Sequence, residues 1–191
     1  MAGQGGTLTD WINAANPFRR AESEGEAVRA ARIGAVVLAL LAALIVVTLP
    51  LKLAMMHRMF AAMPSILAAD PRTANADPAR MQAVLQQMAA VLPPVIAVVL
   101  LVLAAVYVLL AVVQWKKPNA IIPAIFLAFA AYGVLSLLLN VLARPAMRTM
   151  LTALPLPPWY WAYSIAVLIL QIVLLAASFR GALRLGRLRA G

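Results

Sequence analysis

Methionine and histidine side chains gather in one short stretch that could bind a metal ion. Met56, His57, Met59 and Met63 follow the first long apolar run, and the three methionines share one face of a helix. Thioether and imidazole groups are ligands that soft ions such as Cu(I) prefer. Methionine also fills irregular gaps in apolar packing, and we favour that explanation. The stretch therefore predicts either an outer-face Cu(I) site or, more simply, a packing surface.

Few other residues could do chemistry. The chain has no cysteine and one histidine, and its acids all lie outside the long apolar runs: Asp10, Glu22, Glu24, Glu26, Asp70 and Asp77. Proton-coupled pumps need carboxylates or histidines within the membrane, and intramembrane hydrolases need paired catalytic groups. No phosphate-binding loop, nucleophile elbow or dinucleotide fingerprint is present. We therefore expect no enzyme activity, no catalytic residues and no cofactor.

The composition is that of a membrane protein. The chain is 65% hydrophobic and 12% charged, with a mean hydropathy of +0.94. A soluble domain is about 45–50% apolar and about 25% charged. The net charge of +10 does not indicate nucleic-acid binding, because the cations flank apolar runs instead of covering a soluble face.

Long apolar runs predict an all-α integral membrane protein with four transmembrane helices. The expected spans cover residues 33–56, 95–115, 120–142 and 159–179, each above the length of about 18 residues that signals a crossing. They form two tandem helical hairpins, residues 32–116 and 117–180. A cytoplasmic segment with a short interfacial helix (1–31) precedes them, and a basic tail (181–191) follows.

Several local signals predict where helices begin and end. Ser23 with Glu26 is a capping box, and Asp77 before a proline starts another helix. The tight link of residues 116–119 predicts that the flanking spans form an antiparallel hairpin. Pro50 is expected to kink the outer end of the first span.

An amphipathic helix is predicted within an outer insertion, residues 65–92. Its apolar stripe comprises Met81, Val84, Leu85, Met88, Val91 and Leu92. We expect this helix to lie on the outer surface and to pack on the bundle.

An internal repeat is suggested by two nine-residue segments that share the pattern M-x-x-M-apolar-x-A-apolar-P. They are Met56–Pro64 and Met147–Pro155, and each is expected to mark an elbow where the chain leaves the membrane. A second correspondence aligns Tyr107 with Gln171, Gln114 with Ser178 and Trp115 with Phe179. Such a parallel repeat predicts a pseudo-two-fold axis along the membrane normal. The alternative is chance similarity in a chain rich in alanine and leucine.

Polar residues within the spans are few: Tyr107, Gln114, Tyr132, Ser136, Asn140, Gln171 and Ser178. Asn140, Gln171 and Tyr107 are the candidates for a polar pathway between the hairpins. The structural alternative, which we favour, is hydrogen bonding between helices at about 1 kcal/mol each. Gly133 is a candidate position for close helix approach.

Cation placement predicts the orientation. Ten lysines and arginines fall on the side of the two termini and six on the other, which places both termini in the cytoplasm of a bacterium with the chain in its inner membrane. The tail arginines Arg180, Arg184, Arg187 and Arg189 could bind anionic lipid headgroups or an acidic partner, or serve only to set topology.

The function that these features favour is a small non-catalytic accessory or scaffold protein that binds its own copy or another membrane protein. The first alternative is a small channel or transporter with a path between the hairpins. The second is Cu(I) handling at Met56, His57, Met59 and Met63.

Overall fold

Helices make up the regular structure of the part of the chain that the computed structural model describes, residues 7–19, 21–68, 77–143 and 158–190. They are α1 (Leu8–Ala15), α2 (Glu24–Ala68), α3 (Pro78–Lys116), α4 (Ile121–Ala143) and α6 (Pro158–Ala190). Three of them, α2, α3 and α6, are long and apolar enough to cross a membrane. The apolar stretch of α4, Ile121–Ser136, is shorter. The structure is thus that of an all-helical membrane protein.

The predicted starts of α2 and α3 are confirmed. Ser23 Oγ accepts the backbone N–H of Glu26 at 3.3 Å, and Asp77 accepts the N–H of Ala79 at 2.9 Å. The box at Ser23 differs in one detail, because the Glu26 carboxylate accepts the N–H of Glu22 at 2.8 Å. Capping side chains satisfy backbone donors that the first turn leaves without helical partners.

Two helices continue through prolines at which the sequence predicts a kink or a helix boundary. Pro50 and Pro64 lie inside α2, and Pro93 and Pro94 lie inside α3. The predicted elbow at residues 56–64 and the separate surface helix are therefore wrong, since both segments belong to long helices. A proline removes one backbone hydrogen bond and bends a helix. Ending the helix in an apolar environment would leave many more backbone groups without hydrogen bonds. The second elbow, residues 147–155, lies outside the described residues.

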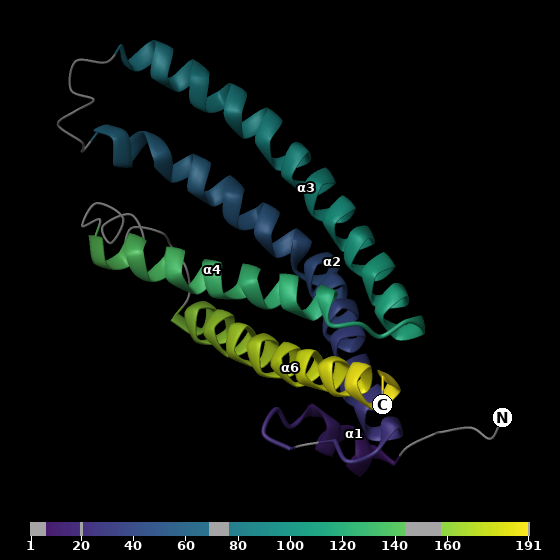
Figure 1. Ribbon diagram of the computed structural model, residues 1–191. Helices are drawn as coiled ribbons and strands as arrows, with labels where there is room; N and C mark the ends of the chain where they lie inside the picture. Colours follow the sequence, from purple (N-terminus) through teal and green to yellow (C-terminus); the bar gives the residue numbers. More distant parts are fainter. Residues whose placement is uncertain (1–6, 20, 69–76, 144–157, 191) are drawn as a thin grey trace.

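Helix α2 lies at the centre of the arrangement (Figure 1). It packs against α3 along one side and against α6 along another, while α4 packs on α6 and α1 contacts both α2 and α6. Helix α1, the C-terminal end of α6 and the turn between α3 and α4 lie at the same end of the molecule (Figure 1). We call this the basic end, because it holds Arg19, Arg29, Arg32, Lys116, Lys117, Arg180, Arg184, Arg187 and Arg189.

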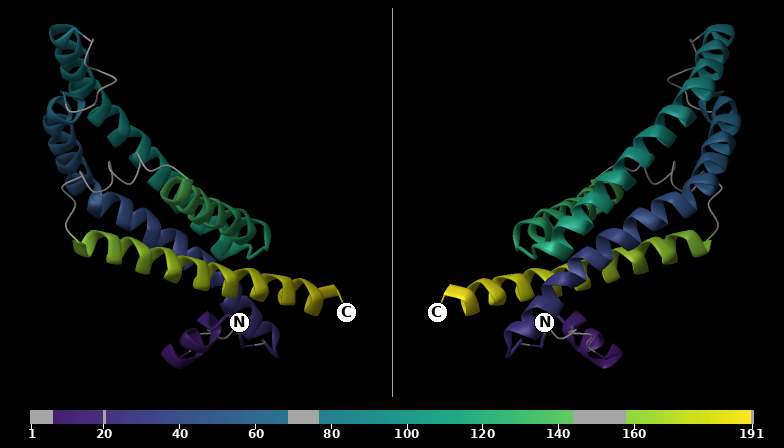
Figure 2. Two further views of the ribbon diagram at one scale, coloured as in Figure 1. Left: turned by 90° about the vertical axis from the view of Figure 1, so that its left-hand side faces the viewer. Right: turned by 90° about the vertical axis from the view of Figure 1, so that its right-hand side faces the viewer.

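The short α3–α4 link does not produce a packed pair of helices. Among the described residues α3 and α4 make little contact, and they diverge away from the basic end (Figures 1 and 2). A two-fold relation between the hairpins would require α3 to pack on α4 as extensively as α2 packs on α6. The packing therefore lacks the predicted pseudo-two-fold symmetry.

The core lies toward the basic end, where four helices come together. Its buried cluster comprises Ile33, Val37, Leu38, Ala111, Phe126 and Leu175. One covered face runs the length of α3 at helical spacing: Met81, Leu85, Ala89, Pro93, Ile96, Leu100, Ala104, Tyr107, Ala111 and Gln114. Because α2 packs along α3, this continuous face keeps α3 a single helix.

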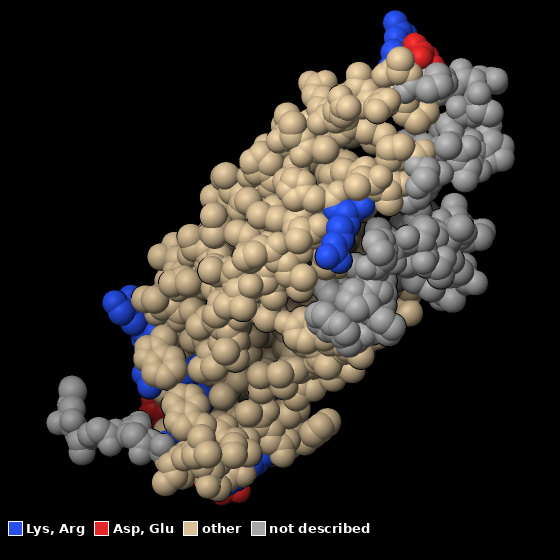
Figure 3. Space-filling view, turned by 180° about the vertical axis from the view of Figure 1, so that it is seen from behind, with Lys and Arg blue, Asp and Glu red and all other residues tan. Residues whose placement is uncertain are grey.

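Helix lengths differ so much that α2 and α3 extend beyond their neighbours (Figure 1). The 45 residues of α2 span about 67 Å at the usual rise, against about 30 Å for the hydrocarbon core of a bilayer. We call residues 51–68 of α2 and 78–93 of α3 the distal arm. A broad surface without charged side chains lies along the molecule beyond the basic end (Figure 3).

Candidate functional site

One backbone carbonyl at the basic end joins three helices. Gln114 Nε2 on α3 donates to the carbonyl oxygen of Ala31 on α2 at 3.1 Å, and Ser178 Oγ on α6 donates to the same oxygen at 2.8 Å. Both side chains are fully buried, where an unpaired polar group would be unfavourable. The two bonds thus fix how α3 and α6 sit along α2. The predicted repeat aligns these two residues with each other, and their shared structural role agrees with the interhelical bonding we favoured.

Gln114 also fixes the turn that leads into α4. Its Nε2 donates to the Asn119 carbonyl at 3.0 Å, and the Asn119 N–H donates to Gln114 Oε1 at 3.4 Å. Asn119 Oδ1 in turn accepts the N–H groups of Ile121 and Ile122 at 3.0 and 3.1 Å. One buried glutamine therefore couples the start of α4 to α2.

Two glycines allow α2 and α6 to approach closely. A Cβ atom at Gly181 would lie 2.7 Å from the backbone nitrogen of Ala31, and one at Gly34 would lie 2.5 Å from Ser178 Oγ. The sequence-based choice of Gly133 for close approach is wrong, because a Cβ there would meet nothing within 4 Å. Close backbone contact is what brings Ser178 within reach of its carbonyl acceptor.

An aromatic stack holds α1 against the bundle. The rings of Trp11 and Trp115 lie 5.9 Å apart and 8° from parallel. The guanidinium carbon of Arg32 lies 5.0 Å from the Trp115 ring centre, and its Nε donates to the Trp115 carbonyl at 3.2 Å. Stacking and cation–π contacts add specific orientation to apolar burial. Leu8 and Ile12 of the same helix stay exposed, as an interfacial helix would require.

Two arginines of α6 hold the segment that links α1 to α2. Arg180 donates to the carbonyl of Pro17, and Arg184 Nε donates to the carbonyl of Ala21 at 3.3 Å. The predicted basic tail is thus a helical continuation of α6 that contacts the N-terminal region.

A pocket of about 350 Å³ opens between α6, the start of α2 and this linking segment. Its charged lining consists of Arg19, Arg180, Arg184 and Arg187, and no carboxylate belongs to the described lining. Ala177 and Leu183 add apolar side chains to the lining. Four positive charges therefore face one small volume.

The nearby carboxylates are already engaged in ion pairs. Glu24 Oε1 lies 2.8 Å from Arg189 Nε, and Glu26 Oε1 lies 3.5 Å from an Arg19 nitrogen. All four side chains are about a third exposed or more, so each pair contributes little to stability. The pairs show which arginines already have a carboxylate partner. Arg189 pairs with Glu24 and does not line the pocket.

Hydrogen bonds lower the pKa of two acids of this region. The backbone N–H of Thr7, followed by its hydroxyl, lowers the pKa of Asp10 below its ordinary value. The backbone N–H of Glu22 is the main cause of the lowered pKa of Glu26, to which the nearby Arg19 guanidinium adds. Asp10 belongs to a second capping box, with Thr7 as the N-cap of α1.

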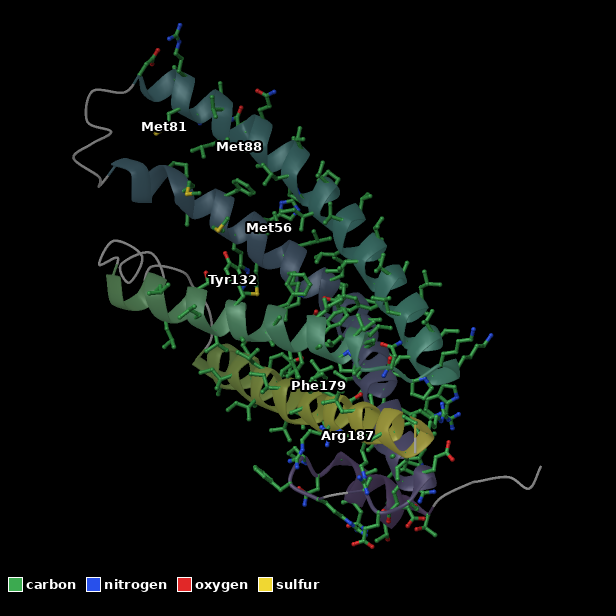
Figure 4. The ribbon with its side chains drawn as sticks, viewed as in Figure 1. Met56, Met81, Met88, Tyr132, Phe179 and Arg187 are labelled. Atoms are coloured by element: carbon green, nitrogen blue, oxygen red, sulfur yellow. The ribbon has the colours of Figure 1, made fainter. Side chains whose placement is uncertain are left out.

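The methionine–histidine candidates lie on the distal arm. Met56 (labelled in Figure 4), Met59 and Met63 are half-buried around the buried Phe60, whereas His57 is exposed. Successive helical residues differ by about 100° in direction, which turns His57 away from the methionine face. No group of three or more His, Cys, Asp or Glu that could hold a metal is found within the described residues. This placement suits packing, and Cu(I) binding stays an untested prediction.

The candidates for a polar pathway come from three different helices. Tyr107 on α3 packs edge-on against Phe126, with the ring centroids 5.3 Å apart. Gln171 on α6 is half-buried. Asn140 belongs to α4, but its side chain lies outside the described residues. Tyr132, labelled in Figure 4, is 70% exposed and therefore faces away from the packed helices.

Sequence reasoning missed the docking of the N-terminal segment and the pocket that it completes. Arg19 and Arg32 entered only as cations that set orientation, although both take part in specific contacts. A signal was present in two tryptophans, Trp11 before the first apolar run and Trp115 at the end of the expected span 95–115, whose rings stack in the structure. Nothing in residue spacing could have indicated which arginine meets which carbonyl.

Comparisons with protein-family models, with curated proteins and with solved structures find no match for this chain.

Proposed function

We propose that the chain is a four-span inner-membrane protein without catalytic activity that works by binding a second protein. Helix α4 supplies the fourth crossing in this proposal, because its 23 residues span about 35 Å and a bilayer core needs about 30 Å. Within the described residues, the buried polar side chains are Gln114 and Ser178, and both are used in bonds between helices. That use supports a structural role over a catalytic one.

The basic end would face the cytoplasm, with both termini there. Nine of the cations assigned to that side gather at this end of the structure, and cytoplasmic flanks are enriched in lysine and arginine. The chain has no cysteine, so a single introduced one reports its own location. A membrane-impermeant maleimide should label Ala190→Cys only after cells are opened, and labelling of intact spheroplasts would reverse the orientation.

The observation that carries the binding proposal is an uncovered apolar stripe on α3. Val84, Met88, Val91 and Val95 are 50%, 45%, 52% and 53% exposed, and they recur at helical spacing. About 20 residues ending at Trp115 are enough to cross the hydrocarbon core. Val84, Met88 and Val91 then lie beyond it, where an apolar face indicates a protein contact.

A second copy of this chain is the occupant that we propose for the stripe. Most oligomers are homo-oligomers with two-fold symmetry, in which one surface contacts its own counterpart. The stripe is uncharged and lies on a long helix, so two copies can align it without placing charges opposite each other.

Single-cysteine cross-linking in native membranes tests this contact. Met88→Cys and Val91→Cys should form disulfide-linked dimers, while Gln86→Cys, exposed on another side of α3, should not. Equal cross-linking at Met88 and Gln86 would indicate random collision and contradict the proposal. A heavier adduct specific to Met88→Cys would keep the binding role but assign the stripe to a different membrane protein.

A further inference from the structure

We propose that the pocket at the basic end binds the phosphate group of an anionic phospholipid. The site combines α6, the start of α2 and the segment between α1 and α2, and its charged lining is Arg19, Arg180, Arg184 and Arg187. The inference is independent of the stripe on α3, which lies on the opposite half of the molecule (Figure 1).

The arginines retain donors for an anion. A guanidinium carries five N–H donors in a planar fork that suits phosphate oxygens. The hydrogen bonds of Arg180 and Arg184 to the carbonyls of Pro17 and Ala21 each use one guanidinium nitrogen. Arg187, labelled in Figure 4 near the linking segment, makes no ion pair with the acids that the structure describes. Arg19 already pairs with Glu26. An anion would neutralise the other three lining arginines, Arg180, Arg184 and Arg187, which have no ion pair with the described acids.

The position of the pocket favours a lipid over a free anion. The apolar run of α6 ends at Phe179, and Arg180 is the first charged residue after it. Ala177 and Leu183 also belong to the lining, so the pocket has an apolar side next to its arginines. A phospholipid can therefore place its phosphate on the arginines while its acyl chains stay in the membrane.

The structure also changes which tail arginines are involved. Arg189 pairs with Glu24 at 2.8 Å and does not line the pocket. Arg19 comes from the linking segment and does line it. Diffuse attraction of a basic tail would treat Arg187 and Arg189 alike, whereas a defined pocket distinguishes them.

The test measures lipid bound to the full chain in neutral detergent by native mass spectrometry, with phosphatidylglycerol and phosphatidylcholine as probes. The wild type should retain phosphatidylglycerol in preference to phosphatidylcholine. Arg187→Gln should weaken that binding by about tenfold or more, the loss expected for a charge-assisted bond. Arg189→Gln, with the same change in net charge, should leave it within about twofold, as exposed charges act weakly. Arg187→Lys should restore part of the affinity.

Two results would overturn the proposal. Equal weakening by Arg187→Gln and Arg189→Gln would reduce the effect to general electrostatics. Displacement of phosphatidylglycerol by equimolar inorganic phosphate or glycerol phosphate would assign the pocket to a soluble anion. Circular dichroism and gel filtration of each variant confirm that it is folded. If Arg187→Gln does not fold, Arg19→Gln provides a second variant of the pocket lining.

Discussion

Gln114 on α3 and Ser178 on α6 donate to one and the same carbonyl oxygen, that of Ala31 on α2. Because one bond comes from α3 and the other from α6, the carbonyl fixes the positions of these two helices along α2. The close backbone approach at Gly181 lies one turn away on α6 and maintains the same position. The N-terminal segment docks on this tightly packed end of the molecule.

Removing either donor should destabilise the protein, but to different degrees. Ser178→Ala loses one interhelical bond and should lower the unfolding free energy by about 1 kcal/mol. Gln114→Leu also removes the two bonds between Gln114 and the Asn119 backbone and should cost about 2 kcal/mol. Thermal unfolding in detergent measures both. Since the two share an acceptor, the double variant should not show a simple sum, and strict additivity would argue against a shared site.

A glycine pair provides a matched test of the α2–α6 contact. Gly181→Ala would place a Cβ 2.5 Å from that of Ala30, and should lower stability by about 1–3 kcal/mol. Gly186→Ala, five residues along the same helix, meets nothing within 4 Å and should be neutral or stabilising by up to about 1 kcal/mol. Similar unfolding temperatures for the two variants would mean that α6 does not pack on α2 in this way.

Helix starts and the membrane class were predictable, because they depend on local chemistry. The cap at Ser23 and the proline after Asp77 act within a few residues, so sequence alone identifies them. The continuity of α2 and α3 was not predictable from the same local signals. Pro50 and Pro93 disfavour a helix locally, and only packing along the neighbouring helix, which sequence spacing does not reveal, outweighs them.

Docking of α1 depends on its stacked tryptophan. Trp11→Ala should release α1 and make the linking segment more sensitive to trypsin, which can cut at Arg19. Ile12→Ala, at a 63% exposed position of the same helix, should leave the cleavage rate unchanged. The rates follow from gel analysis of timed digests, and equal cleavage of both variants would show that the Trp11–Trp115 stack does not hold α1.

The two acids near α1 predict a dependence of its docking on pH. Their folded-state pKa values are lowered from 3.8 for Asp10 and 4.5 for Glu26, so their stabilisation is present above about pH 4.5. It is lost as the pH falls below these ordinary values and through the lowered folded ones. Hydrogen exchange of the backbone amides of α1 and the linking segment, measured across this pH range, should show the loss of protection at acid pH. Glu26→Gln should make that loss smaller. An unchanged profile in Glu26→Gln would exclude this carboxylate.

The pocket could not be predicted because its parts are far apart in the sequence. Arg180 and Pro17 become neighbours only when α6 crosses the N-terminal segment. By contrast, the structural use of Gln114 and Ser178 follows from a general rule that polar groups within a membrane bond to other helices. The rule indicates the type of contact, while the identity of the acceptor, Ala31, required the fold.

The proposed binding of a second protein through α3 can be tested by the mass of the protein purified from native membranes in mild detergent. One copy has a mass of 20.4 kDa. We expect a complex of two copies that Met88→Glu, which places a charge on the stripe, converts to single copies. A wild-type protein that runs only as one copy and carries no other protein would contradict the claim.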